Sequence, residues 1–239
     1  MPMWIKICAN TNVEDALLAA ELGADAVGFV LAPSKRRITG EQVEEIVDRL
    51  PDGVEKVGVF HTSDPYEVEH FVACAGLTIA QLHGAFDSEM VRLLGNEFGG
   101  NEFGGKLKII QTVAYEVDAK DRAAADARFE EMLGAAFAEP AVWAVLLDAA
   151  KSGASGGLGV VFDWAHVAEI VRRTAGSRDP KPRVILAGGL KAENVAEAIA
   201  QLRPWGVDVA SGVEASPGVK DAEKLCRFIE NAHTAALPR

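Results

Sequence analysis

Short apolar runs recur along the chain, and each is followed by a segment whose apolar residues return every three or four positions. Such runs indicate buried strands, and the longer spacing indicates amphipathic helices. Strands that alternate with helices are typical of a parallel sheet. The pattern predicts eight strands, at 4–8, 26–31, 56–60, 78–83, 106–113, 142–148, 183–189 and 207–212.

Eight consecutive strand and helix units predict an α/β fold in which a parallel eight-stranded sheet closes into a (β/α)8 TIM barrel. No Pro- or Ser-rich linker divides the chain, so we expect one domain over residues 1–239. Polar residues mark the helix starts. Thr11 and Glu14 have the spacing of a capping box, and the other expected N-caps are Thr39, Asp64, Asp163 and Asp221.

A tandem repeat, GNEFGGNEFGG at 95–105, interrupts this regularity. Its glycines and its place between a helix and a strand favour a surface loop that was lengthened by duplication. The Ala-rich segment 114–140 is long enough to contain a complete helix.

The formal net charge is −11, which disfavours binding to nucleic acid or to an acidic membrane surface. The chain has no uninterrupted apolar stretch of about 18 residues and no signal-peptide pattern at its start. We therefore expect a cytoplasmic protein. Its cysteines, Cys8, Cys74 and Cys226, match no metal-binding or redox spacing, so we expect no metal and no disulfide framework.

Two polar residues stand at the ends of predicted strands, where ligands of parallel barrels bind. Cys8 ends the first strand and Asp148 ends the sixth. Side chains alternate along a strand, so Lys6 shares a face with Cys8, and Leu146 shares one with Asp148. A free cysteine often serves only as a small buried hydrophobe, and an aspartate at this place can instead cap a loop.

Glycine-rich segments follow the last three strands, at 153–159, 187–190 and 210–218. Glycine lets backbone N–H groups approach an anion, and the loops after strands seven and eight commonly bind phosphate in these barrels. We therefore expect a small phosphorylated ligand. Arg36 and Arg37 follow the second strand and can bind a carboxylate, although they also suit a solvated basic turn. His83 ends the fourth strand and has either a ligand contact or a supporting role.

Several blocks of the chain resemble phosphoribosylanthranilate isomerases of tryptophan biosynthesis. They are IKICANT, GADAVGFV followed by SKRR, AQLHG, LLD with GGLGVVFDW, ILAGGLKAENVAEAI and VASGVEASPGVKD, and they span nearly the whole sequence. The resemblance implies a TIM barrel that performs an Amadori rearrangement without a cofactor, as a monomer or a homodimer.

The resemblance also implies roles for individual residues. Cys8 matches the general base, Asp148 the general acid, and Arg36 the residue that contacts the anthranilate carboxylate, with Arg37 as the alternative. The residues that match the phosphate-binding loops are Gly188, Gly189, Ser211 and Gly212. For this chemistry we expect the N-terminus of the first helix to help lower the pKa of Cys8, and burial or the negative charge of the substrate to raise that of Asp148.

The chain departs from the family pattern at three places. Ala9 follows Cys8 where glycine is usual and implies ordinary backbone angles, Leu158 replaces a hydroxyl residue, and SKRR replaces SPRY. Rival interpretations are another phosphate-binding barrel enzyme, a dual-substrate sugar isomerase, a Schiff-base lyase that uses Lys6, and a non-catalytic phosphate-binding barrel.

Overall fold

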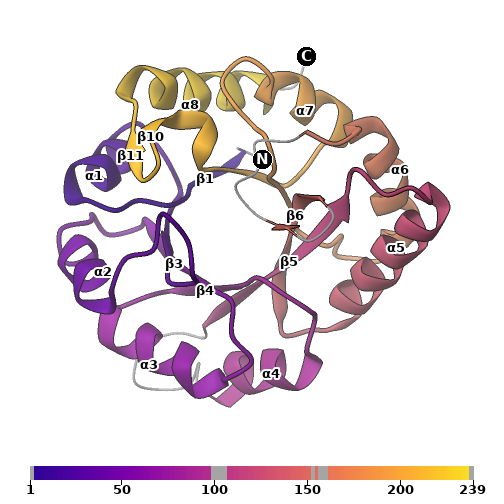
Figure 1. Cartoon of the computed structure of the whole chain (residues 1–239), viewed down its shortest axis with the longest axis horizontal. Helices are drawn as coiled ribbons and strands as arrows, with labels where there is room; N and C mark the ends of the chain where they lie inside the picture. Colours follow the sequence, from indigo (N-terminus) through magenta and orange to yellow (C-terminus); the bar gives the residue numbers. More distant parts are fainter. Residues whose placement is uncertain (1–2, 98–106, 152–153, 156–160, 237–239) are drawn as a thin grey trace.

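Parallel strands close into a ring in the computed structural model of the chain, and helices surround the ring (Figure 1). The structure describes residues 3–97, 107–151, 154–155 and 161–236. Within these residues the strand order is β5-β4-β3-β2-β1-β9-β8-β6, and β5 pairs with β6 to complete the barrel. The ring strands are β1 (Trp4–Ile7), β2 (Ala26–Val30), β3 (Glu55–Phe60), β4 (Ile79–Leu82), β5 (Lys108–Glu116), β6 (Val142–Lys151), β8 (Val184–Leu186) and β9 (Gly206–Val209).

The helices of the outer layer follow the ring strands one by one, which confirms the predicted (β/α)8 barrel. They are α1 (Val13–Glu21), α2 (Gly40–Val47), α3 (Pro65–Ala75), α4 (Ser88–Arg92), α5 (Arg122–Ala138), α6 (Trp164–Ala175), α7 (Val195–Leu202) and α8 (Ala222–Ala236). Within the described residues, no helix has both the length and the apolar character that a membrane crossing requires.

Short elements decorate the barrel. A π-helical turn, η1 (Leu93–Glu97), follows α4 and holds the start of the GNEFG repeat, while the rest of the repeat, 98–105, lies outside the described residues. Strand β7 (Ala154–Ser155) pairs antiparallel with β6. After β9 come a 3-10 turn, η2 (Ser211–Val213), and a hairpin of β10 (Glu214–Ser216) and β11 (Val219–Lys220), which lies beside α1 and α8 in Figure 1.

Alternation along the strands divides the apolar residues between two layers. In β1, Ile5 and Ile7 face the helices, whereas Trp4 belongs to the cluster inside the ring. The interior cluster takes one or two residues from most ring strands: Trp4, Ala26, Val57, Ile79, Ile110, Ala144, Leu146, Ile185 and Ala187. This packed interior leaves the strand ends as the place for a site.

The first helix begins one residue later than the capping-box prediction. Asn12 is its N-cap, and the Asn12 side chain accepts a hydrogen bond from Asp15 N and donates one to Asp15 Oδ2, both at 2.8 Å. Thr11 instead donates its hydroxyl to Gly218 O, 2.5 Å away. The Thr11 hydroxyl is therefore bound to a distant carbonyl and does not cap α1. The predicted starts at Thr39, Asp64, Asp163 and Asp221 are confirmed, since each side chain accepts a hydrogen bond from an N–H group of its helix.

Three tryptophans gather at the amino-terminal end of the barrel. The rings of Trp4 and Trp205 stack with centroids 5.2 Å apart, and Trp143 meets Trp205 edge-on at 5.1 Å. The guanidinium of Arg183 lies over both Trp143 and Trp205, 5.1 and 5.5 Å from the ring centroids. These contacts tie the start of β6 to the segments just before β8 and β9.

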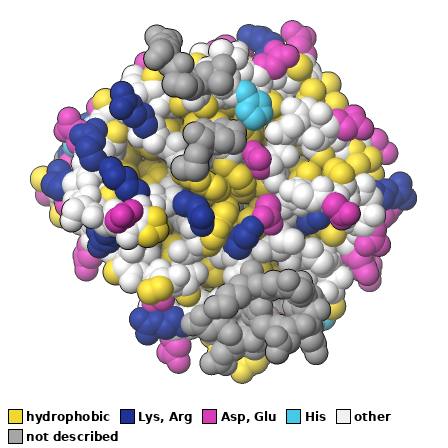
Figure 2. Space-filling model, turned by 180° about the vertical axis from the view of Figure 1, so that it is seen from behind, with side chains coloured by type: hydrophobic (Ala, Val, Ile, Leu, Met, Phe, Trp, Pro, Cys, Tyr) yellow, Lys and Arg dark blue, Asp and Glu magenta, His cyan; other side chains and the backbone are white. Residues whose placement is uncertain are grey.

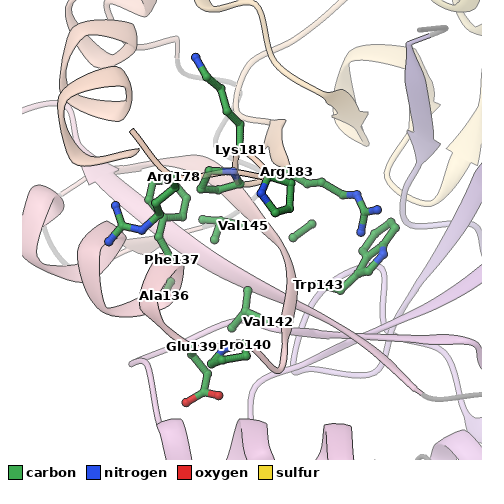
Figure 3. Close-up of a pocket in the computed structure, with 13 residues that line it drawn as sticks. Ala136, Phe137, Glu139, Pro140, Val142, Trp143, Val145, Arg178, Lys181 and Arg183 are labelled. Atoms are coloured by element: carbon green, nitrogen blue, oxygen red, sulfur yellow. The ribbon is translucent and has the colours of Figure 1, made fainter. Parts of the chain in front are cut away.

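A hollow of about 500 Å³ lies beside this tryptophan cluster, between the end of α5 and the segment 178–183. Arg183 extends toward Trp143, whereas Arg178 and Lys181 extend away from the hollow (Figure 3). Figure 2 shows exposed apolar side chains with Lys and Arg around them on the face opposite to Figure 1. The charged groups that line the hollow do not converge on one point, so we place the candidate site at the other end of the strands.

Candidate active site

Cys8 stands at the carboxyl end of β1, on the face of the strand that points into the barrel mouth. Its side chain is buried, with a relative exposure of 7% for the residue. A Cβ atom at Gly28 on the neighbouring strand β2 would lie 2.8 Å from the Cys8 sulfur, so this position accepts only glycine without a shift. The sequence therefore leaves room for the thiol at the floor of the mouth.

The residue after Cys8 has an unusual backbone. Ala9 has φ of 61°, in the left-handed region that side chains other than glycine rarely adopt. The expectation of ordinary angles at Ala9 is therefore wrong. In this conformation the Ala9 N–H donates to the Cys8 side chain and favours its thiolate. The local geometry is kept despite the absence of glycine, at a cost of about 1–2 kcal/mol.

Charged groups lie directly beneath Cys8. Lys6 is completely buried, and its Nζ lies 3.0 Å from Asp208 Oδ1 of β9 and donates to Gln81 Oε1 of β4 at 2.7 Å. Burial lowers the pKa of Lys6, but Asp208 and Cys8 outweigh burial and leave it above its ordinary value. A lysine that stays protonated is a poor nucleophile, which removes the support for a Schiff-base lyase.

The pKa of Cys8 is raised in this site, contrary to the expectation from the helix N-terminus. Burial is the main cause and Asp208 adds to it, whereas Lys6, Lys220 and the Ala9 N–H act in the opposite direction. The thiolate therefore depends on nearby cations, of which Lys6 is close in the sequence and Lys220 is brought in only by the fold.

Asp148 stands at the same end of β6, with a relative exposure of 8%. Its Oδ1 accepts a hydrogen bond from Ala149 N at 2.8 Å. Burial raises the pKa of Asp148 to about 6, the Ala149 N–H opposes this rise, and the charge of Asp208 adds to it. The predicted upward shift is confirmed, and a carboxyl group with this pKa can donate a proton near neutral pH.

A small cavity of about 70 Å³ adjoins Asp148. Gly188 and Gly189 both have positive φ, 79° and 64°, which turns the chain sharply after β8. Ser211 begins η2 after β9, and a Cβ at Gly212 would lie only 1.9 Å from Leu190 O. The predicted phosphate residues are thus brought together. The complete lining is Asp148, Ala187, Gly188, Gly189, Leu190, Asp208, Val209, Ala210, Ser211 and Gly212.

The two arginines of the predicted carboxylate site differ in their surroundings. Arg36 donates to both carboxylate oxygens of Glu214, through Nε at 2.8 and 3.1 Å and through one terminal nitrogen at 2.7 Å. The charge of Cys8 contributes to raising the pKa of Arg36, so the guanidinium lies within electrostatic range of the thiol. Arg37 is exposed to solvent. The structure therefore favours Arg36 as the ligand-facing arginine.

Histidine 83 follows β4, and its ring lies 6.3 Å from that of His61. Burial lowers the pKa of His83, and the charges of His61 and Lys6 lower it further. A neutral imidazole at the mouth fits a supporting role better than a proton-transfer role.

Three buried charged residues of the candidate site escaped the sequence prediction: Asp208, Glu214 and Lys220. Asp208 was detectable in principle, because a carboxylate within the apolar run VDV needs a partner. Glu214 and Lys220 lie in a loop segment where charges are ordinary, and only the β10–β11 hairpin brings them to Cys8.

The structure describes only part of the glycine-rich segment 153–159. Gly153 and residues 156–160 of the glycine-rich segment after β6, which include Leu158, lie outside the described residues. Within the described part of the chain, no group of three or more His, Cys, Asp or Glu side chains is arranged to hold a metal ion.

Comparison with known proteins agrees with this geometry. The family profile described as N-(5'phosphoribosyl)anthranilate (PRA) isomerase matches residues 5–231. An N-(5'-phosphoribosyl)anthranilate isomerase of Symbiobacterium thermophilum is 37% identical over 98% of this chain and 100% of its own length.

Solved structures agree as well. The phosphoribosyl anthranilate isomerase of Thermotoga maritima is 36% identical, with a TM-score of 0.77 over 96% of this chain and 98% of its own. A structure of such an enzyme in complex with reduced 1-(o-carboxyphenylamino)-1-deoxyribulose 5-phosphate is 34% identical, with a TM-score of 0.73 over the same shares of the two chains.

Proposed function

Because this chain belongs to the N-(5'-phosphoribosyl)anthranilate isomerase family, we propose that Cys8 and Asp148 are the base and the acid of its reaction. The enzyme converts N-(5'-phosphoribosyl)anthranilate to 1-(2-carboxyphenylamino)-1-deoxyribulose 5-phosphate in tryptophan biosynthesis. The observation that carries the proposal is that a buried thiol and a buried carboxyl group stand at the same end of the barrel, with the carboxyl group beside a glycine-lined cavity.

The reaction begins with a proton transfer from Asp148. The carboxyl group, whose pKa of about 6 keeps part of it protonated near neutral pH, donates to the ring oxygen of the ribose. The bond from that oxygen to C1 breaks, and the nitrogen lone pair forms a Schiff base. The Cys8 thiolate then removes the proton from C2. The resulting enolamine tautomerises to the ketone, so no atom is gained or lost overall.

Two anchors hold the substrate during these steps. The phosphate binds in the cavity formed by Gly188, Gly189, Ser211 and Gly212, where backbone N–H groups and the absence of Cβ atoms suit an anion. The anthranilate carboxylate binds Arg36, which presents the guanidinium edge that Glu214 does not occupy. The two anchors stretch the substrate across the mouth, with the ribose between the acid and the base.

The decisive experiment measures turnover of freshly generated phosphoribosylanthranilate by the loss of its fluorescence. Wild type is expected to be active, and Cys8→Ser and Asp148→Asn are each expected to lower kcat by about 10² or more, as loss of a general acid or base does. Cys74→Ser, at an exposed cysteine on α3, is the matched control and should retain full activity. Full activity of either site variant would refute the assigned role.

The proposal extends to assembly and location. A solved Thermotoga maritima relative is described as dimeric, and a homodimer or a monomer is therefore the expected state of this chain. We expect the enzyme to work in the cytoplasm. Sedimentation velocity decides between the monomer and the homodimer.

A further inference from the structure

Lys220, on β11, reaches back to the end of β1. Its side chain is completely buried, and its Nζ donates a hydrogen bond to the carbonyl oxygen of Cys8. The backbone N–H of Lys220 donates to Asp15 Oδ2 at 2.7 Å, which fixes the hairpin against α1. A buried ammonium group is unfavourable unless its charge and hydrogen bonds are used. The contact of this group with the backbone of Cys8 therefore indicates a role for Lys220 at that residue.

The charge of Lys220 is only partly balanced. The nearest carboxylate is Glu214, whose Oε1 lies 3.6 Å from Lys220 Nζ. The same carboxylate is held at 2.7–3.1 Å by Arg36 and also accepts the Gly218 N–H at 3.2 Å. One carboxylate thus faces two cations and is bound more closely to Arg36. With Lys220 protonated, the cluster of Arg36, Glu214 and Lys220 carries a net positive charge beside Cys8. Burial lowers the pKa of Lys220, and the carboxylates of Glu214 and Asp15 oppose that fall.

We propose that Lys220 is a positioning residue for the general base, which fixes the backbone of Cys8 and favours the thiolate by its charge. This inference rests on the proposed role of Cys8. It adds a function for the β10–β11 hairpin, whose second strand brings the ammonium group to the backbone of Cys8.

Lys220 shares the stabilisation of the thiolate with Lys6, whose effect on the pKa of Cys8 is the larger of the two. From β1, Lys6 favours the thiolate, but Asp208 of β9 lies 3.0 Å from Lys6 and opposes it. From the loop after β2, Arg36 also faces the thiol, but its charge is paired with Glu214. Lys220 lowers the pKa of Cys8 and is held by a hydrogen bond to the same residue.

The test follows the alkylation rate of Cys8 with iodoacetamide as a function of pH, in a protein that carries Cys74→Ser and Cys226→Ser. In this background Lys220→Met is expected to raise the pH of half-maximal reactivity by about one unit, the shift typical of losing one nearby charge. Alkylation at pH 7.5 should slow about tenfold. Lys220→Gln keeps a hydrogen-bond donor but not the charge, and it should show a similar shift.

The matched control is Lys224→Met. Lys224 donates to the Glu214 carbonyl oxygen from α8 at 2.8 Å, and its side chain is 48% exposed, so its charge is screened by solvent. Its loss should move the alkylation curve by less than about 0.3 pH units. An unchanged curve in a folded Lys220 variant overturns the proposal, as does an equal shift in Lys224→Met.

A further variant keeps the test decisive if both Lys220 variants unfold. Glu214→Gln removes the negative charge that offsets Lys220, so the half-maximal pH should fall, and an unchanged or higher value would contradict the proposal. Alkylation needs no substrate, so it separates this inference from the isomerase assignment. In turnover, Lys220→Gln should lower kcat/KM across the plateau between the pKa values of Asp148 and Cys8 and move its alkaline fall to higher pH, which a purely structural defect would not do.

Discussion

Arg36 reaches across the barrel mouth from the loop after β2 and binds both carboxylate oxygens of Glu214, at the start of β10. The pair is largely buried, with side-chain exposures of 17% and 4%. It holds the guanidinium plane in one orientation before any substrate arrives, and preorganisation of this kind reduces the entropy lost on binding.

Replacing Arg36 by lysine is therefore expected to raise KM by about 10-fold or more while kcat changes by less than about threefold. A lysine keeps the charge but lacks the planar fork. Arg37→Lys, at the exposed neighbour, is the control and should change neither constant. Steady-state kinetics on both variants decides the assignment, and the reverse pattern would transfer the carboxylate site to Arg37.

Asp148 is expected to shape the acid side of the pH profile. The productive enzyme has Asp148 protonated and Cys8 ionised, yet the pKa of Asp148, about 6, lies below that of the buried thiol. Between the two pKa values, this productive form is a small and constant fraction of the enzyme. We therefore expect kcat/KM to rise up to about pH 6, to stay level above it, and to fall above the pKa of the thiol. A profile without an inflection near 6 would contradict this order. Asp163→Asn, at an exposed helix cap, should keep the inflection.

The same pKa predicts a stability effect. A carboxyl group whose pKa is higher in the folded than in the unfolded state stabilises the fold at low pH, and this contribution is lost as pH rises through the folded pKa. The rise from 3.8 to about 6 corresponds to up to about 3 kcal/mol. Asp148→Asn should therefore increase the free energy of unfolding at pH 8 and change it little at pH 4. Urea unfolding at the two pH values measures the difference, and equal effects would argue against a buried charge.

Ala9→Gly is expected to stabilise the protein by about 0.5–1 kcal/mol, because glycine adopts a φ of 61° without the strain that alanine suffers. The gain is reduced by the greater backbone freedom of glycine in the unfolded chain. Ala16→Gly, in the buried face of α1, is the control and should destabilise by about 1 kcal/mol or more. Thermal unfolding of both variants tests the prediction, and a loss of stability in Ala9→Gly would show that the left-handed backbone is not strained.

Gly212→Ala is expected to disrupt the phosphate cavity, since its Cβ would lie 1.9 Å from Leu190 O and the backbone must move. KM and the inhibition constant for inorganic phosphate should both rise about 10-fold or more, because the backbone donors shift away from the anion. Gly134→Ala, in α5, meets only an ordinary contact at 3.8 Å and should leave both constants unchanged. Unaltered phosphate inhibition in Gly212→Ala would place the anion elsewhere.

The barrel was predictable because each strand and helix unit has a local pattern. Strands such as β1 are short apolar runs, and the helices begin at N-caps such as Thr39 and Asp64. Cys8 and Asp148 were predictable as candidates for the same reason, since strand ends share one rim. The capping of α1 was not, because Thr11 is drawn to Gly218, which is distant in sequence.

The pKa of Cys8 could not be predicted either, because it depends on residues that only the closed barrel brings together. The pKa of Cys8 sums contributions from Lys6, Asp208 and Lys220, which lie on β1, β9 and β11, and its direction follows only from their distances and burial. The conformation of Ala9 likewise depends on tertiary contacts that override the preference of alanine. Local patterns therefore specify the scaffold, and long-range contacts set the protonation states.

The tryptophan cluster gives the protein an internal optical probe. Trp4, Trp143 and Trp205 come from segments that meet only when the first, sixth and last ring strands are assembled, and they lie at the end of the barrel opposite Cys8 and Asp148. We expect coupling between these indoles to give an exciton signal in far-ultraviolet circular dichroism. That signal reports the closure of the barrel, whereas the fluorescence of an anthranilate reports binding at the catalytic end. Folding and ligand binding can therefore be followed at separate wavelengths in one sample.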